Sequence, residues 1–370
     1  MMRGAVRGAA IGRAPALLAC AAFLLAGCAA TPEAALLRGT PVPTRTLEGA
    51  PPLRDGRAEF RATFCGALRA DGLLPPDDAG CDRWLWRLPD EPDLSAQPAA
   101  ASVVPGRIAV FLVTGAFSEC VDPASRPFAD GAARLRAGGA QVETIVVGGR
   151  SGTEHNARQI AESLGQVPLD GGSAVILIGY SKGALDILRF MVDFPQVAGR
   201  VDAVVSVASP VFGTPLADAA DPAYSTLLAR LPYEKCPPGD GRVISSLSPA
   251  TATAWLRSNA LPAGARYYSL AGFTTRERVA RTLVPSWKYL SRNDARNDGQ
   301  VVASDAVIPG ATLLGYANAD HWGIAQTIET VHPVLVARED PARFPLEQLF
   351  LAIVQFVAAD LARDNGSQVP

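Results

Sequence analysis

Ser173-Ala-Val-Ile-Leu-Ile-Gly179-Tyr-Ser181-Lys-Gly183 joins an apolar stretch to Gly-x-Ser-x-Gly, and a helical pattern follows over residues 184–194. A strand that turns sharply into a helix exposes one side chain at the apex, and that residue must tolerate strained backbone angles. Gly179 and Gly183 lack the β-carbons that would collide in so tight a turn. The stretch therefore predicts a strand, a turn and a helix, with the Ser181 hydroxyl standing clear of a sheet.

Apolar stretches and helical patterns alternate on both sides of this unit. Strands are predicted over 107–113, 142–147, 174–178, 203–207 and 266–271, and helices over 123–137, 154–164 and 186–194. Strands that are apolar at every residue are typical of parallel sheets covered on both faces. The order predicts an α/β fold with a doubly wound, mostly parallel sheet.

Composition divides the chain into segments around this core. Residues 1–27 resemble a signal peptide, and residues 28–56 are rich in Ala, Pro and Thr without periodicity, as in a flexible tether. Residues 57–105 form an N-terminal extension, and residues 106–363 form the α/β domain, which ends in an apolar helix over 350–359. Residues 215–265 interrupt the strand series, so we expect a cap or lid over the carboxyl ends of the strands.

The N-terminus predicts export. Arg3, Arg7 and Arg13 precede an apolar segment too short to span a membrane, and Leu25-Ala-Gly-Cys28 resembles the lipobox of bacterial lipoproteins. The resemblance implies cleavage before Cys28 and acylation of that residue, which would anchor the chain to a membrane. In Gram-negative cells, Ala29 after the cysteine implies the outer membrane, with the protein facing the periplasm. The alternative is an ordinary secretory peptide that is cleaved elsewhere.

The cysteines and the net charge limit the classes of partner. Cys20 leaves with the signal peptide and Cys28 would be acylated, so the four remaining cysteines predict two disulfides. Of three pairings we favour Cys65 with Cys81, which share one local segment, and Cys120 with Cys236, which would join two loops. A formal net charge of −2 gives no footprint for nucleic acid. We expect no metal site, because there is no Cys-x-x-Cys and the three histidines do not cluster.

Nucleophilic chemistry at Ser181 would require a base. His321 follows an apolar stretch over 311–316 that would be the last strand, so it is the best candidate. His155 lies too early in the chain, and His332 precedes Pro333 in an irregular stretch. An ordinary, partly buried loop histidine is the alternative role for His321.

An acid is also needed to orient the base. Asp298 lies in an Asp-Gly turn, where backbone amides can hold its carboxylate ionised and aimed. The alternative role is a purely structural Asx-turn. Asp294, Asp305 and Asp320 are competitors for the same role.

Four motifs together resemble bacterial lipases and esterases of the α/β-hydrolase fold. They are Gly179-Tyr-Ser-Lys-Gly183, Ser209-Pro-Val-Phe-Gly-Thr-Pro-Leu-Ala-Asp218, Asn297-Asp-Gly-Gln-Val-Val302 and Asp320-His-Trp322. The resemblance covers residues 107–359, and the chain order Ser, Asp, His agrees with that fold. It implies a serine hydrolase that cleaves carboxylic or lipid esters through an acyl-enzyme, with Ser181 as nucleophile, His321 as base and Asp298 as acid. No cofactor is implied.

The same resemblance implies an oxyanion hole formed by two backbone amides. We assign them to Lys182, at the start of the helix, and to Ala116, with Phe117 as the next choice for the second donor. Related lipases usually carry Met, Gln or Leu where this chain has Lys182. We expect its ammonium to point to solvent; the alternatives are an acidic partner or a bias toward anionic substrates.

Two other functions are compatible with these motifs. The first is acyl transfer from the same acyl-enzyme to an alcohol or lipid acceptor. The second is a non-catalytic envelope lipoprotein built on a hydrolase fold. The sequence predicts neither the ester that is cleaved nor the oligomeric state.

Overall fold

The computed structural model describes residues 1, 32–37, 41–75, 80–94, 108–121, 126–169, 172–220, 237–326, 337–339 and 343–366. Two compact units, Met1–Arg38 and Gly39–Pro370, separate by their contacts. The first contains helix α2 (Pro32–Leu37). Of the signal peptide predicted over 1–27, the described residues include only Met1. Cys28 lies outside the described residues.

The second unit contains a seven-stranded parallel sheet. Its strands are β1 (Arg54–Asp55), β2 (Ile108–Val113), β3 (Gln141–Ile145), β4 (Ala174–Tyr180), β5 (Ala203–Val207), β6 (Arg266–Gly272) and β7 (Thr312–Ala317). They lie in the order β1-β7-β6-β5-β4-β2-β3. The predicted doubly wound α/β fold is therefore confirmed.

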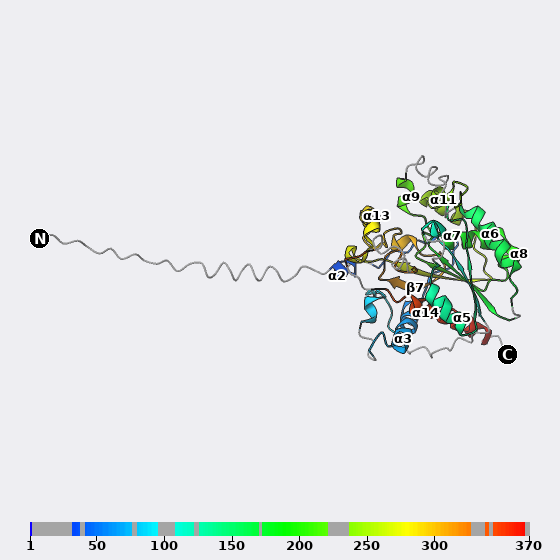
Figure 1. Ribbon diagram of the computed structural model, residues 1–370, viewed down its shortest axis with the longest axis horizontal. Coiled ribbons are helices and arrows are strands. Elements are labelled where there is room, and N and C mark those ends of the chain that lie inside the picture. The colour runs from blue at the N-terminus through cyan, green and yellow to red at the C-terminus, as the bar shows by residue number, and fades with distance from the viewer. Residues whose placement is uncertain are drawn as a thin grey trace. The chain divides into compact units, whose positions relative to one another are not determined.

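Helices cover both faces of the sheet. α3 (Arg57–Ala70), α5 (Ala129–Ala137) and α14 (Leu346–Gly366) pack on one face, and α6 (Thr153–Gln166), α7 (Lys182–Asp193) and α8 (Pro195–Ala198) pack on the other (Figure 1). Every residue of β2 is buried, with Val110 and Leu112 in the first core and Phe111 and Val113 in the second. Alternation of side chains across the sheet thus fills both layers with one apolar strand.

The remaining elements are short. They are α4 (Ser118–Val121), α9 (Pro215–Ala219), α11 (Val243–Ser246), α12 (Pro249–Ser258), α13 (Val284–Leu290), η1 (Cys81–Arg83), η3 (Arg276–Arg278), η4 (Arg281–Leu283) and η5 (Ala303–Asp305). The helix expected over 123–137 begins at Ala129, and α4 precedes it. No helix within the described residues combines the length and hydrophobicity needed to cross a membrane.

Part of the predicted tether is built into the domain. β1 pairs with β7 at the edge of the sheet, although its two polar residues give no apolar pattern in the sequence. Arg54 holds the strand by donating to the Asp360 carboxylate of α14 at 2.9 Å. Arg45 pairs with Asp305 at 3.3 Å and lies over the Phe212 ring. Residues 41–56 are therefore attached to the same unit as the sheet.

The N-terminal extension packs against the core. Phe60 of α3 contacts the Phe356 ring of α14 edge to face, with 5.9 Å between the ring centroids. The predicted disulfide between Cys65 and Cys81 is present and ties α3 to η1. Cys120 is also disulfide-bonded, and Cys236, its predicted partner, lies outside the described residues.

Candidate active site

Ser181 occupies the turn between β4 and α7 in a strained conformation, with φ 53° and ψ −131°. Its amide donates to the Val207 carbonyl of β5 at 3.0 Å, which fixes the turn against the neighbouring strand. A β-carbon on Gly179 would collide with the backbone of Ala184, as expected for a helix that folds back on its own strand. A β-carbon on Gly183 would lie 2.5 Å from the Val113 carbonyl oxygen, so this glycine is needed for packing on β2.

Ser181, His321 and Asp298 form one hydrogen-bonded chain. Nε2 of His321 lies 2.9 Å from the Ser181 Oγ, and Nδ1 lies 2.8 Å from the Asp298 Oδ2. His321 and Asp298 are both buried. The geometry suits transfer of the serine proton to Nε2 while the carboxylate orients the ring and stabilises its charged form.

The carboxylate of Asp298 is held by backbone donors. Its Oδ1 accepts from the amides of Gln300 at 2.8 Å and Val301 at 2.7 Å, which leaves Oδ2 for His321. The Asx-turn considered as an alternative role is thus formed by the same side chain that contacts the imidazole. The two amides therefore fix the orientation of the carboxylate and aim Oδ2 at the ring.

Two further contacts fix His321. Its amide donates to the Asp298 carbonyl at 2.8 Å, so base and acid are also joined through their backbones. The Tyr180 hydroxyl, from the last residue of β4, donates to the His321 carbonyl at 2.7 Å. Burial, together with the charges of Asp298 and Asp320, raises the Tyr180 pKa well above its ordinary value, so the tyrosine stays a neutral donor. Sequence reasoning missed Tyr180, which adjoins the serine in the motif.

The competing candidates are engaged elsewhere. Asp294 pairs with Arg296 at 2.9 Å, Asp305 with Arg45, and Asp320 with Arg338 at 2.8 Å. His155 lies in the first turns of α6, and His332 lies outside the described residues. Within the described ranges, no group of three His, Cys, Asp or Glu side chains could hold a metal ion.

The loop after β2 lies directly against the nucleophile. A β-carbon on Gly115 would be 3.0 Å from the Ser181 Cβ, tighter than an ordinary contact, so glycine favours this approach. Phe117 adopts a left-handed φ of 58°, and its amide donates to the Gly149 carbonyl at 2.9 Å. Phe117, the next choice as oxyanion donor, is therefore occupied. Within the described residues, the amides of Ala116 and Lys182 donate to no backbone carbonyl.

The expectation that the Lys182 ammonium points to solvent is wrong. Its Nζ pairs with the Asp186 carboxylate of the same helix at 2.6 Å, and both side chains are 1% exposed. Burial raises the pKa of Asp186, an effect that the Lys182 charge and hydrogen bonds from Lys182 and Asn156 oppose. The alternative of an acidic partner is the one observed. Sequence spacing alone could have pointed to Asp186, since residues four apart share one helix face.

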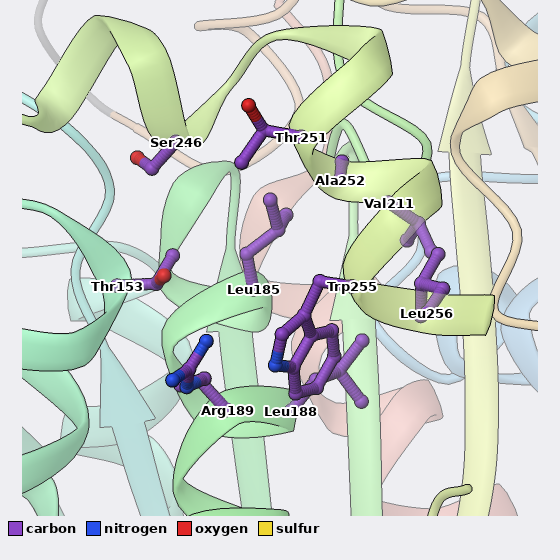
Figure 2. A pocket seen from close by; sticks show the side chains of 10 residues that line it. All are labelled: Thr153, Leu185, Leu188, Arg189, Val211, Ser246, Thr251, Ala252, Trp255 and Leu256. Atoms are coloured by element: carbon purple, nitrogen blue, oxygen red, sulfur yellow. The ribbon is translucent and has the colours of Figure 1, made fainter. Parts of the chain in front are cut away.

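A small cavity lies between α7 and the insertion (Figure 2). Its volume is about 50 Å³. Leu185 and Leu188 of α7 line one side, and Trp255 reaches across from α12. Arg189 also lines the cavity, with its guanidinium 5.6 Å from the Trp255 ring centroid. Side chains of α12, within the insertion, thus form an apolar wall beside the helix that starts after Ser181.

Asp305, which follows the loop that carries Asp298, makes the stability of the fold depend on pH. Burial raises its pKa from 3.8 to about 6, with Arg45 opposing the change. The Asp305 carboxyl binds its proton more tightly in the folded state than in the unfolded state. Loss of this proton therefore lowers the free energy of unfolding as pH rises from about 4 to 6. We expect Asp305→Asn to be more stable than the wild type at pH 7 but not at pH 4. The gain in the free energy of unfolding at pH 7 should be at most about 3 kcal/mol.

Urea titrations at pH 4, 5, 6 and 7 would measure this effect. Asp305→Asn also loses the ion pair with the exposed Arg45. This loss would subtract at most about 1 kcal/mol from the gain in the free energy of unfolding at neutral pH. A difference between the two proteins that stays constant over this pH range would contradict the prediction. Asp93→Asn provides the matched control, because its exposed carboxylate also pairs with an arginine, Arg87.

Comparison with known proteins gives a solved structure of related architecture. No protein-family model matches the chain, and no curated protein sequence matches it. The metagenomic carboxyl esterase MGS0156 is 35% identical, with a TM-score of 0.77 over 83% of this chain and 93% of that chain. The mature lipase BlEst2 of Bacillus licheniformis is 23% identical, with a TM-score of 0.49 over 63% and 93%.

Proposed function

The chain belongs to the α/β-hydrolase family, together with the carboxyl esterase that it resembles, and on this premise we propose that it hydrolyses carboxylic esters. The observation that supports this most directly is the chain of contacts from Asp298 through His321 to Ser181. A hydroxyl with a base on one side and an orienting acid beyond it is the arrangement that activates serine for attack on a carbonyl.

In the proposed reaction the Ser181 Oγ attacks the ester carbonyl carbon while Nε2 of His321 takes the hydroxyl proton. The amides of Ala116 and Lys182 donate to the oxyanion of the tetrahedral intermediate. The intermediate collapses to an acyl-enzyme as Nε2 returns the proton to the departing alcohol. Water then attacks the acyl-enzyme with His321 as base, and the carboxylic acid is released as Ser181 recovers its proton.

The cavity beside α7 supports esters with a small apolar acyl part. Leu185 lies one helical turn after Ser181, about 6 Å along the helix axis, and most of the lining is apolar. Each methylene buried there would contribute about 0.8 kcal/mol, or about fourfold in kcat/KM. A volume of about 50 Å³ limits this gain to short chains.

A fluorophosphonate probe tests the enzyme hypothesis. We expect covalent labelling of the wild-type protein and none of Ser181→Ala, because the probe traps a serine activated by a base. p-Nitrophenyl esters of increasing acyl length, assayed beside the probe, should show kcat/KM rising over the first members and then falling. Folded wild-type protein that neither labels nor hydrolyses any of these esters would refute the proposal.

We also propose export and lipid anchoring through Cys28, with an outer-membrane location facing the periplasm. Support comes from the lipobox-like sequence and from the disulfide between Cys65 and Cys81, since disulfides persist in oxidising compartments. The same probe, applied to membrane and soluble fractions, should label the membrane fraction. Cys28→Ala should move the labelled protein to the soluble fraction, and labelling that stays with the membrane would refute the anchor.

A further inference from the structure

A buried ion pair directly follows the nucleophile. Lys182 and Asp186 are each 1% exposed and are 2.6 Å apart. Removing two charges from water costs free energy that their attraction often fails to recover, so an apolar pair of similar volume would stabilise a helix interface at least as well. The pair therefore calls for a role other than stability, and its contacts indicate which.

The contacts lead from α7 to the loop after β3. Asp186 uses its second oxygen to accept from the Asn156 Nδ2 of α6 at 2.8 Å. The same Nδ2 donates to the Gly148 carbonyl at 3.1 Å. Lys182 is thereby connected, through two buried side chains, to the backbone of residues 148–149.

Gly149 carries the connection to the loop beside Ser181. Its carbonyl accepts from the Phe117 amide at 2.9 Å, and its amide donates to the Glu119 carboxylate at 2.7 Å. A β-carbon on Gly149 would lie 2.7 Å from the Phe117 nitrogen, so the two segments are in close contact. The bond from the Phe117 amide fixes the peptide between Ala116 and Phe117, which adjoins the Ala116 amide, and Phe117 itself is left-handed.

We propose that Lys182, Asp186 and Asn156 are positioning residues that hold the amides of Lys182 and Ala116 in register around Ser181. This inference rests on the proposed function. The two amides belong to separate segments, the start of α7 and the loop after β2, and an oxyanion hole requires their relative placement to within a fraction of an ångström. The buried network joins the two segments, and low local polarity strengthens its bonds.

The positions of these groups argue against a direct chemical role for the lysine. The Nζ of Lys182 is directed at Asp186, and an ammonium that forms this pair has no lone pair with which to accept the serine proton. His321 already occupies the hydrogen-bonding position at the Ser181 Oγ. The lysine acts on the reaction through the backbone that it holds.

The test compares folded variants in which the network is cut at two points. Lys182→Met combined with Asp186→Leu replaces the ion pair by apolar side chains, and Asn156→Ala cuts the link to Gly148. We expect each to lower kcat about 10- to 100-fold, less than the loss on deleting an oxyanion donor, with KM nearly unchanged. Combining all three substitutions should lower kcat little more than either cut alone, because both cuts interrupt the same path from Lys182 to Gly148.

Phenylboronic acid, which forms a tetrahedral adduct with a catalytic serine, provides a readout that a merely structural role would not move. Its inhibition constant should rise by the same factor by which kcat/KM falls. Hydrogen exchange of the amides over residues 115–119 should also accelerate, a readout that does not require activity. Glu162→Gln, at an exposed position of α6 outside the network, is the matched control and should change none of these values.

Two outcomes would overturn the inference while leaving the proposed function intact. One is kcat within about twofold of wild type in folded network variants, with unchanged exchange at residues 115–119. The other is a loss of kcat without weaker boronate binding, which would place the defect outside the oxyanion hole. Wild-type protein that fails to react with a fluorophosphonate would instead refute the ester hydrolase itself.

Discussion

Replacing either Ser181 or His321 by alanine is expected to reduce kcat for ester hydrolysis by a factor of about 10⁶, and replacing both should reduce it no further. The reason is the single contact between them. Nε2 of His321 is 2.9 Å from the Ser181 Oγ, so the hydroxyl is activated only through this base. Once one partner is lost, the other has no remaining chemical role, and the two losses cannot add.

Steady-state kinetics on the three variants and the wild type would measure this coupling. The substrate is a p-nitrophenyl ester, and the fluorophosphonate reaction checks that residual activity does not come from wild-type contamination. His155→Ala is the matched control, because His155 lies on α6 away from the triad contacts and should leave kcat unchanged. Losses that multiply in the double variant would show that Ser181 and His321 act independently and would contradict the proposed triad.

The residues of this triad could be predicted because each has a local signal. The elbow around Ser181 depends on an apolar strand, two glycines and a helix, all within a few residues of one another. Asp298 lies in an Asp-Gly turn whose amides bind its own carboxylate, which is again a local interaction. His321 followed from its position after the last strand. Chain order then combined these three signals into one hypothesis.

The structure differs from prediction where a residue is placed by distant parts of the chain. The Lys182 side chain was expected in solvent because the sequence does not reveal that α6 packs over that face of α7 and brings Asn156 to Asp186. β1 was missed because its pairing with β7 depends on Arg54 reaching Asp360, which lies 306 residues further along the chain. Wall residues of the cavity, such as Trp255, could not be assigned because the packing of the insertion has no periodic signal.

Replacing Asp298 by asparagine is expected to lower kcat by about 10⁴ while changing the stability little. The amides of Gln300 and Val301 occupy Oδ1, and an asparagine would keep its carbonyl oxygen in that position because these donors need an acceptor. Its amide group would then face Nδ1 of His321, where Asp298 now presents Oδ2 at 2.8 Å.

An amide donor at that position selects the wrong tautomer of the base. Nδ1 would have to accept, so the ring proton would move to Nε2, and Nε2 could no longer take the proton of Ser181. Because the loop keeps its hydrogen bonds, thermal unfolding should stay close to that of the wild type, and KM should change far less than kcat. Asp294→Asn, in the same loop region but paired with Arg296, should retain wild-type activity. If Asp298→Asn keeps kcat within about tenfold of wild type, the contact between Asp298 and His321 is structural, and another group must orient the base.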